Sequence, residues 1–136
     1  MIPMERSDLV ILMEGGYLYL RMGRFDEARD VFEGVAVLAP ETEIPLVAVG
    51  SVFFAQTKFD QAVQAYKKAL ALKPASAFAR AYLGEALYFK GKKEEALAEL
   101  RKASDLEPSG QSGDFARSLL EAIQKGFVPP GHATQH

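Results

Sequence analysis

The chain has 136 residues, of which 49% are hydrophobic and 25% are charged, and its formal net charge is −2. This balance is typical of a soluble globular domain, and it argues against nucleic acid as the main partner, because phosphate binding needs clustered Lys and Arg. The absence of cysteine excludes disulfides, thiolate metal sites and cysteine nucleophiles.

Three residue types recur along the chain with one spacing. Pro40, Pro74 and Pro108 lie 34 residues apart, and glycines and alanines repeat the same step, at Gly16, Gly50 and Gly84 and at Ala28, Ala62 and Ala96. A period of 34 residues is typical of stacked helix pairs. The glycines and alanines predict close contacts between two helices, with large side chains such as Phe32, Tyr66 and Leu100 filling the space beside them.

The chain resembles the tetratricopeptide-repeat (TPR) family over residues 9–110, in the frames 9–42, 43–76 and 77–110. The family positions read Leu12, Gly16, Tyr19, Ala28, Phe32, Val35 and Pro40 in the first repeat. They read Leu46, Gly50, Phe53, Ala62, Tyr66, Ala69 and Pro74 in the second, and Arg80, Gly84, Leu87, Ala96, Leu100, Ala103 and Pro108 in the third. The departures are Arg80 for an apolar residue, Val35 for a small one, and Lys93 where Phe25 and Phe59 are aromatic.

In chain order the sequence predicts seven helices, over residues 7–21, 26–38, 43–56, 60–72, 77–90, 94–106 and 112–125. The seventh lies outside the repeats and carries Phe115, Leu119, Leu120 and Ile123 on one face, as a helix capping the last repeat would. The resemblance implies an all-α fold, a right-handed superhelical stack of three TPR helix pairs with a C-terminal capping helix. We expect a single domain over residues 1–126 and a flexible tail over 127–136.

The first helix of each repeat is apolar nearly all round, whereas the second helices alternate apolar and charged faces. In the TPR family the free face of the first helix lines a concave groove. The resemblance therefore implies a groove that is apolar and aromatic, with few charges. Its partner-binding residues are Val10, Met13, Glu14, Tyr17, Leu20, Ile44, Val47, Ser51, Phe54, Phe78, Tyr82, Glu85, Tyr88 and Phe89.

Such a groove is suited to an amphipathic helix or an extended apolar segment of another polypeptide. TPR domains that clamp an acidic chaperone terminus use Lys, Arg and Asn, where this chain has Met13, Tyr17, Ala48, Phe78 and Tyr82. Repeat number, acidity and groove composition resemble the type III secretion chaperones, which implies a chaperone that holds a secretion substrate. The alternative is a general TPR adaptor in another complex. A homodimer through the first helices and a complex with a second small chaperone both remain open.

We expect no enzymatic activity, no cofactor and no metal. The two histidines are His132 and His136, and Pro129, Pro130 and Gly131 precede them, which disfavours a helix that would pair them on a metal. No serine has a plausible histidine base. The longest nearly apolar run, Ile44 to Ala55, is shorter than the roughly 20 residues that a membrane helix needs. The protein is therefore expected to be cytoplasmic, without membrane insertion.

Overall fold

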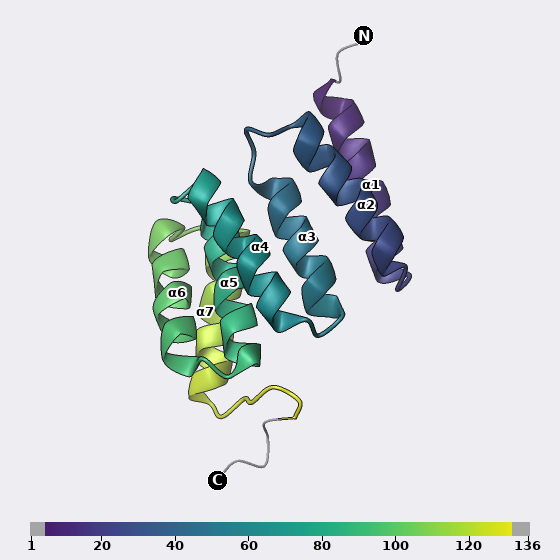
Figure 1. Cartoon of the computed structure of the whole chain (residues 1–136). Coiled ribbons are helices and arrows are strands. Elements are labelled where there is room, and N and C mark those ends of the chain that lie inside the picture. Colours follow the sequence, from purple (N-terminus) through teal and green to yellow (C-terminus); the bar gives the residue numbers. More distant parts are fainter. Residues whose placement is uncertain (1–4, 132–136) are drawn as a thin grey trace. The chain divides into compact units, whose positions relative to one another are not determined.

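The computed structural model describes residues 5–131, which form seven α-helices and no strand (Figure 1). The helices are α1 (Arg6–Arg21), α2 (Phe25–Leu38), α3 (Ile44–Ala55), α4 (Phe59–Leu72), α5 (Ala77–Lys90), α6 (Lys93–Leu106) and α7 (Gln111–Gln124). Each begins and ends within one residue of the predicted position. The prediction of an all-α fold built from helix pairs is confirmed.

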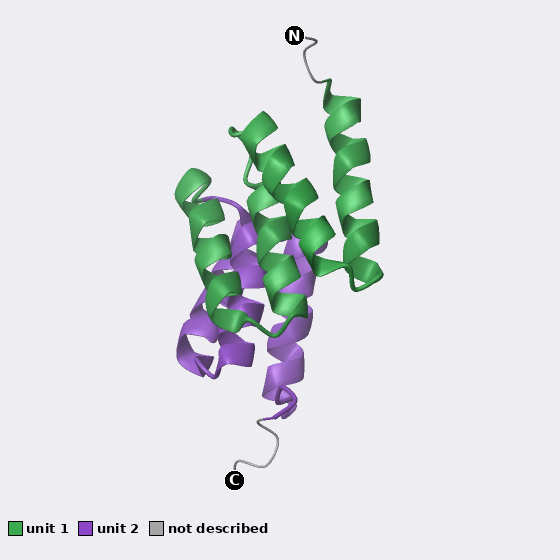
Figure 2. Ribbon diagram, turned by 45° about the vertical axis from the view of Figure 1, so that its right-hand side comes forward, with its two compact units in different colours: residues 1–74 green, residues 75–136 purple. Residues whose placement is uncertain are grey.

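The chain divides into two compact units, Met1–Pro74 and Ala75–His136 (Figure 2). In the first unit α1 packs on α2, α3 packs on α4, and α2 joins the two pairs by packing on α3. In the second unit α5 packs on α6, and α7 packs on both of them. The single-domain organisation over residues 1–126 stays a prediction.

Each helix pair is held by a glycine on its first helix that lies against a large side chain on its second. A Cβ atom added to Gly16 would come within 2.4 Å of Phe32, and one added to Gly50 would come within 2.4 Å of Tyr66. A Cβ at Gly84 would come within 2.7 Å of Leu100. Phe32, Tyr66 and Leu100 are fully buried, which confirms the predicted packing of small against large residues.

The turn inside each repeat has one geometry. A residue at the end of the first helix takes a positive φ, 75° at Gly23 and 60° at Thr57, which each follow the C-cap, and 97° at Gly91, which is itself the C-cap of α5. The next amide then bonds back to the helix, as Lys92 does to the Leu87 carbonyl at 2.8 Å, which closes the helix end. Thr57 is the one non-glycine residue with positive φ in the described part of the chain, so the second repeat carries backbone strain there.

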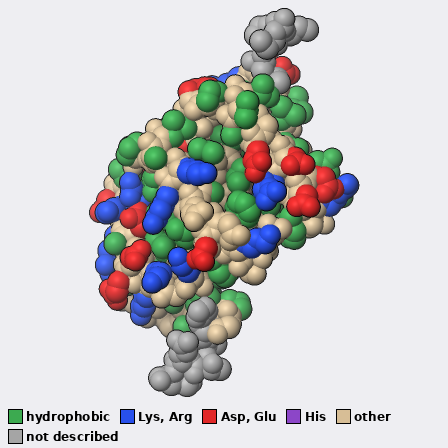
Figure 3. Space-filling model, in the orientation of Figure 1, with side chains coloured by type: hydrophobic (Ala, Val, Ile, Leu, Met, Phe, Trp, Pro, Cys, Tyr) green, Lys and Arg blue, Asp and Glu red, His purple; other side chains and the backbone are tan. Residues whose placement is uncertain are grey.

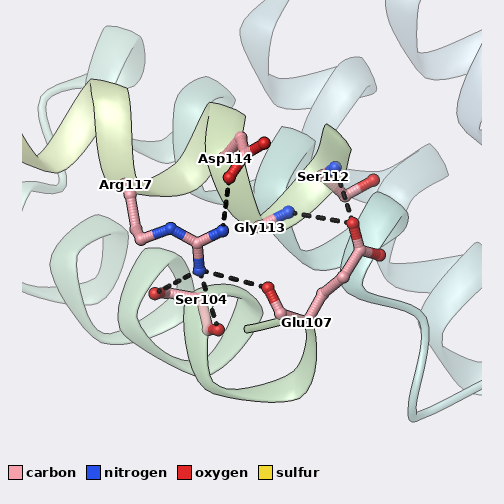
Figure 4. A network of polar contacts seen from close by, with 6 residues as sticks. All are labelled: Ser104, Glu107, Ser112, Gly113, Asp114 and Arg117. Atoms are coloured by element: carbon pink, nitrogen blue, oxygen red, sulfur yellow. Dashed lines mark hydrogen bonds and ion pairs between the residues drawn. The ribbon is translucent and has the colours of Figure 1, made fainter. Parts of the chain in front are cut away.

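A polar network fixes α7 to the end of α6 (Figure 4). The Glu107 carboxylate accepts hydrogen bonds from the backbone amides of Ser112 at 2.9 Å and Gly113 at 3.2 Å, and so caps the start of α7. The Arg117 guanidinium donates to the Ser104 and Glu107 carbonyls, at 3.2 and 3.1 Å, and pairs with Asp114 at 2.6 Å. Gly113 is required at this junction, because a Cβ there would lie 1.9 Å from the Glu107 carbonyl oxygen.

The bounds of α7 follow the 34-residue repeat, although the sequence predicts this helix outside the three repeats. Each end of α7 lies 34 residues after the matching end of α5. Helix α7 packs on α6 and α5, as α3 packs on α2 and α1 in the first unit. It therefore takes the position that the first helix of a further repeat would take.

Side chains of both charge signs share the surface. On the face drawn in Figure 3, acidic and basic groups are interspersed with hydrophobic ones, so neither charge sign dominates this face. Among the described residues, no helix combines the length and apolar character that crossing a membrane would require.

Adjacent glycines in α1 provide a test of the helix contact. We expect Gly16→Ala to lower the free energy of unfolding by about 1–3 kcal/mol, because the methyl group overlaps the buried Phe32 ring. The control Gly15→Ala meets nothing within 4 Å and is expected to raise stability by about 0.5–1 kcal/mol, since alanine is the better helix former. Urea denaturation measures both, and equal stabilities would contradict the close contact.

The turn at Thr57 provides a second test. A left-handed conformation costs a non-glycine residue roughly 1–2 kcal/mol, and a glycine at this position would relieve that cost. The greater conformational freedom of glycine in the unfolded chain offsets about half of the stability gained. Thr57→Gly is therefore expected to stabilise the protein by about 0.5–1 kcal/mol, and the reciprocal Gly91→Thr to destabilise it. Thermal melts followed by circular dichroism give both values. A destabilised Thr57→Gly variant would show that the threonine side chain outweighs its backbone strain.

Candidate interaction surface

An open groove lies at the N-terminal end of the first unit, and we call it the N-terminal groove. It has a volume of about 750 Å³ and is formed by α1, the end of α2, the loop that follows and the start of α3. It is lined by Arg6, Leu9, Val10, Met13, Glu14, Tyr17, Val35, Ala39, Glu41, Thr42, Ile44 and Pro45. Its lining is mostly apolar, with charged groups from Arg6, Glu14 and Glu41.

The groove exists because α1 is apolar on two faces and has packing partners for only one. Its inner face contacts α2, with the Tyr17 and Phe32 ring centroids 4.9 Å apart. Elsewhere on the helix Val10 is 49% exposed and lines the groove, while Ile11 at 64% and Leu18 at 52% are exposed outside the groove lining. Exposed apolar side chains gathered on one helix are unusual on a monomer and indicate an interaction surface.

The predicted residues of the first unit divide into two groups. Val10, Met13, Glu14, Tyr17 and Ile44 come together around the N-terminal groove. The other four pack within the unit. Val47 is fully buried, Leu20 packs against the core, the Ser51 hydroxyl lies 3.2 Å from the Tyr66 hydroxyl, and the Phe54 ring meets Phe59 edge-on at 5.3 Å.

The buried Val47 corrects the assignment of this residue to a partner-binding face. It stands at the same repeat position as Met13, which is half-buried and lines the groove. Val47 lies on α3, which packs against α1, α2 and α4, whereas Met13 lies on α1, which packs against α2 and α3. The same repeat position is therefore covered in one helix and open in the other.

In the second unit, Phe78, Tyr82 and Phe115 form an aromatic cluster. Phe78 meets Tyr82 edge-on, with ring centroids 5.3 Å apart, and Tyr82 stacks on Phe115 at 5.1 Å with an angle of 20° between the ring planes. Phe115 comes from α7, and the sequence predicts it only as part of the apolar face of a capping helix. The 34-residue offset between α5 and α7 is the signal that would have placed it beside Tyr82.

Glu85 is a half-buried carboxyl group on α5, one turn after Tyr82. Burial raises the pKa of Glu85 to about 7, because desolvation disfavours its charged form. Burial also raises the pKa of Tyr82, and the negative charge of Glu85 adds to that rise. Near neutral pH this part of α5 therefore changes between a neutral and an anionic surface.

Tyr88 and Phe89, at the end of α5, meet the segment that follows α7. Both rings lie 6.1 Å from the Phe127 ring, and the Tyr88 hydroxyl donates a hydrogen bond to the Phe127 carbonyl. Tyr88 is 6% exposed, so it does not offer an open surface in this structure. The sequence predicted a flexible tail from Phe127 onward, but Phe127 contacts α5 and Pro129 is buried.

The structure thus brings five of the predicted residues together in the N-terminal groove and places Phe78, Tyr82, Glu85, Tyr88 and Phe89 along α5. Binding of a partner at these residues stays a prediction. His132 and His136 lie outside the described residues. Within residues 5–131 no three His, Asp or Glu side chains are grouped in a way that could hold a metal ion.

Two family models match the sequence. The model described as TPR repeat matches residues 50–91, and the model described as Tetratricopeptide repeat matches residues 12–42 and 80–109. Together they cover more than half of the chain. A comparison with curated proteins gives no significant sequence match.

Solved structures with the same fold include two bacterial chaperones. The type III secretion translocator chaperone SycD of Yersinia enterocolitica has 22% identity and a TM-score of 0.77, over 88% of this chain and 92% of that chain. PcrH from Pseudomonas aeruginosa has 18% identity and a TM-score of 0.76, over 89% and 95%. SycD has been solved with a peptide of the translocator YopD, and PcrH with the chaperone binding region of PopD.

A third similar structure is the first TPR of Spaghetti (RPAP3), bound to the HSP90 peptide SRMEEVD. It has 25% identity and a TM-score of 0.70, over 91% of this chain and 99% of that chain. At these identities the likeness to SycD and PcrH is a likeness of fold.

The pKa of Glu85 predicts a pH dependence of stability. With a pKa of about 7 in the folded state against 4.5 for the ordinary group, folded Glu85 binds more protons between those values. Its contribution to the free energy of unfolding therefore falls as pH rises from about 4.5 to about 7. Glu85→Gln, which stays neutral, is expected to gain stability relative to wild type over this range and to keep that gain above pH 7. Melting temperatures from pH 4 to 8 test this, and a constant difference would contradict it.

Proposed function

Because this chain belongs to the tetratricopeptide-repeat family, we propose that it is a protein-binding module acting as a chaperone for a type III secretion substrate. It holds an apolar or amphipathic segment of that substrate and shields it from aggregation. The proposal places the protein in the cytoplasm and assigns it no catalytic step. The observation that carries it is the N-terminal groove, where apolar side chains remain exposed in an otherwise well-packed helix pair.

The chemistry of the groove favours an apolar segment as the ligand. Val10, Met13, Tyr17 and Ile44 offer apolar and aromatic surface to a ligand that buries its own apolar side chains. On α5, the aromatic cluster and a carboxyl group that burial drives toward its neutral form offer similar surface. The chaperones of like fold that were solved with translocator segments support this class of partner.

A general adaptor is the second candidate, and the likeness to the HSP90-bound TPR of RPAP3 supports it. That peptide ends in Glu-Glu-Val-Asp, so its recognition calls for cationic side chains. The N-terminal groove has one cationic residue, Arg6, alongside the acidic Glu14 and Glu41. This balance of charges favours an apolar ligand over an acidic one.

Capture of the partner by matched variants tests the proposal. Val10→Glu puts a carboxylate into the groove, whereas Val37→Glu puts the same group on α2, where Val37 is 80% exposed and does not line the groove. Burying an unpaired carboxylate against an apolar ligand costs on the order of 3 kcal/mol, which is about a hundredfold in affinity. The tagged proteins are purified from the host organism, and the bound proteins are identified by mass spectrometry.

We expect wild type and Val37→Glu to bring down a substrate of the type III secretion apparatus, and Val10→Glu to lose it while remaining helical. A partner unrelated to secretion that Val10→Glu also loses would support the adaptor instead. Equal capture by all three proteins would contradict a role for the N-terminal groove.

A further inference from the structure

The chain reverses direction directly after α7. Gly126 has a φ of 101°, which L side chains rarely adopt. Its amide bonds to the Ile123 carbonyl at 3.0 Å, and the Phe127 amide bonds to the Ala122 carbonyl at 2.9 Å. This pair of bonds is a Schellman motif, which ends the helix and redirects the next residues. The turn therefore sets the direction in which Phe127 leaves α7.

The redirected segment docks on the end of α5. Phe127 places its ring beside Tyr88 and Phe89, its carbonyl accepts the Tyr88 hydroxyl, and Pro129 is buried. Phe127 itself stays 38% exposed and Val128 41% exposed. Among the described residues, the contact includes one partly exposed aromatic ring, one hydrogen bond and one buried proline.

The repeat pattern explains why an aromatic ring fits here. In the second repeat Phe59 packs edge-on against Phe54, five residues before it. In the third repeat the matching pair is Tyr88 and Lys93, so Tyr88 lacks an aromatic partner from its own repeat. Phe127 supplies that ring from the segment after α7.

We propose that residues 127–130 are an internal occupant of the α5 end of the partner-binding surface, and that a bound substrate segment displaces them. The segment has the chemistry expected of the ligand: it leaves the helix in a non-helical form, presents an aromatic side chain, and carries two prolines that lower the entropy lost on docking. Its short tether gives it a high local concentration, so it covers Tyr88 and Phe89 until a partner with more contacts competes. This inference rests on the proposed function for the identity of the displacing molecule.

A peptide with the sequence of the segment tests the occupancy without any partner. The probe is the synthetic peptide Lys-Gly-Phe-Val-Pro-Pro-Gly, residues 125–131, titrated into ¹⁵N-labelled full-length chains and followed by NMR. Phe127→Ala removes the anchoring ring, and the control Val128→Ala shortens its exposed neighbour. We expect the peptide to shift the amide resonances of Tyr88 and Phe89 in both proteins. The peptide concentration at half-saturation should be at least tenfold lower for Phe127→Ala than for wild type. Val128→Ala should behave as wild type, and a peptide with Ala in place of Phe should not bind.

If Phe127→Ala folds but binds the peptide no better than wild type, the proposal is overturned and the segment is a fixed part of the fold. If Phe127→Ala does not fold, Tyr88→Phe decides, because it removes the hydrogen bond to Phe127 and keeps the ring. We expect Tyr88→Phe to bind the peptide at lower concentration than wild type, and a wild-type response would overturn the proposal. The NMR titration contains no partner, so it does not depend on the proposed function. If the peptide binds as expected but the capture experiment finds no partner, the proposed function is contradicted and the occupancy by residues 127–130 is not.

Discussion

The contact between a glycine on one helix and a large side chain on the next sets the geometry of each pair. At Gly16, Gly50 and Gly84 the backbone of the first helix comes so close to Phe32, Tyr66 and Leu100 that a methyl group does not fit. One face of the first helix therefore packs against its partner helix. Because α1 is apolar nearly all round, its opposite apolar face stays exposed, and this exposed face forms one side of the N-terminal groove.

The sequence predicted this contact because its two sides repeat independently with the same period. The sequence also predicts the helix ends to within one residue, because the turn and proline positions repeat with the same period. The period does not predict which of the groove positions have exposed side chains, because exposure depends on which helices pack over a given face. Val47 and Met13 share one repeat position, and the packing of α3 against α1, α2 and α4 buries the first. The three repeats end at residue 110, so they predict Phe115 only as part of a capping helix and do not predict the contact of Phe127 with α5.

Arg80 shows how the third repeat accommodates a departure from the pattern. It replaces an apolar residue on α5, and it pairs with Glu99 of α6 at 2.7 Å while both side chains remain mostly buried. A buried ion pair costs desolvation that its attraction only partly offsets, so it contributes geometry more than stability. A similar use of charge occurs at the α6–α7 junction, where Glu107 and Arg117 bond backbone groups directly. The second unit therefore adds these directional polar contacts to the apolar packing that both units share.

This difference bears on how the two units would contribute to binding. The N-terminal groove is open and mostly apolar, which favours affinity for any segment that buries apolar surface and gives little selectivity among such segments. On α5, Tyr82 stacks on Phe115 of α7, burial raises the pKa of Glu85 to about 7, and Phe127 contacts Tyr88 and Phe89. Under the proposed function, a ligand at α5 would have to match the orientation of these rings and avoid leaving a charged Glu85 unpaired. Under the proposed function, the second unit would therefore supply selectivity for a particular partner, and the first would supply general affinity for apolar segments.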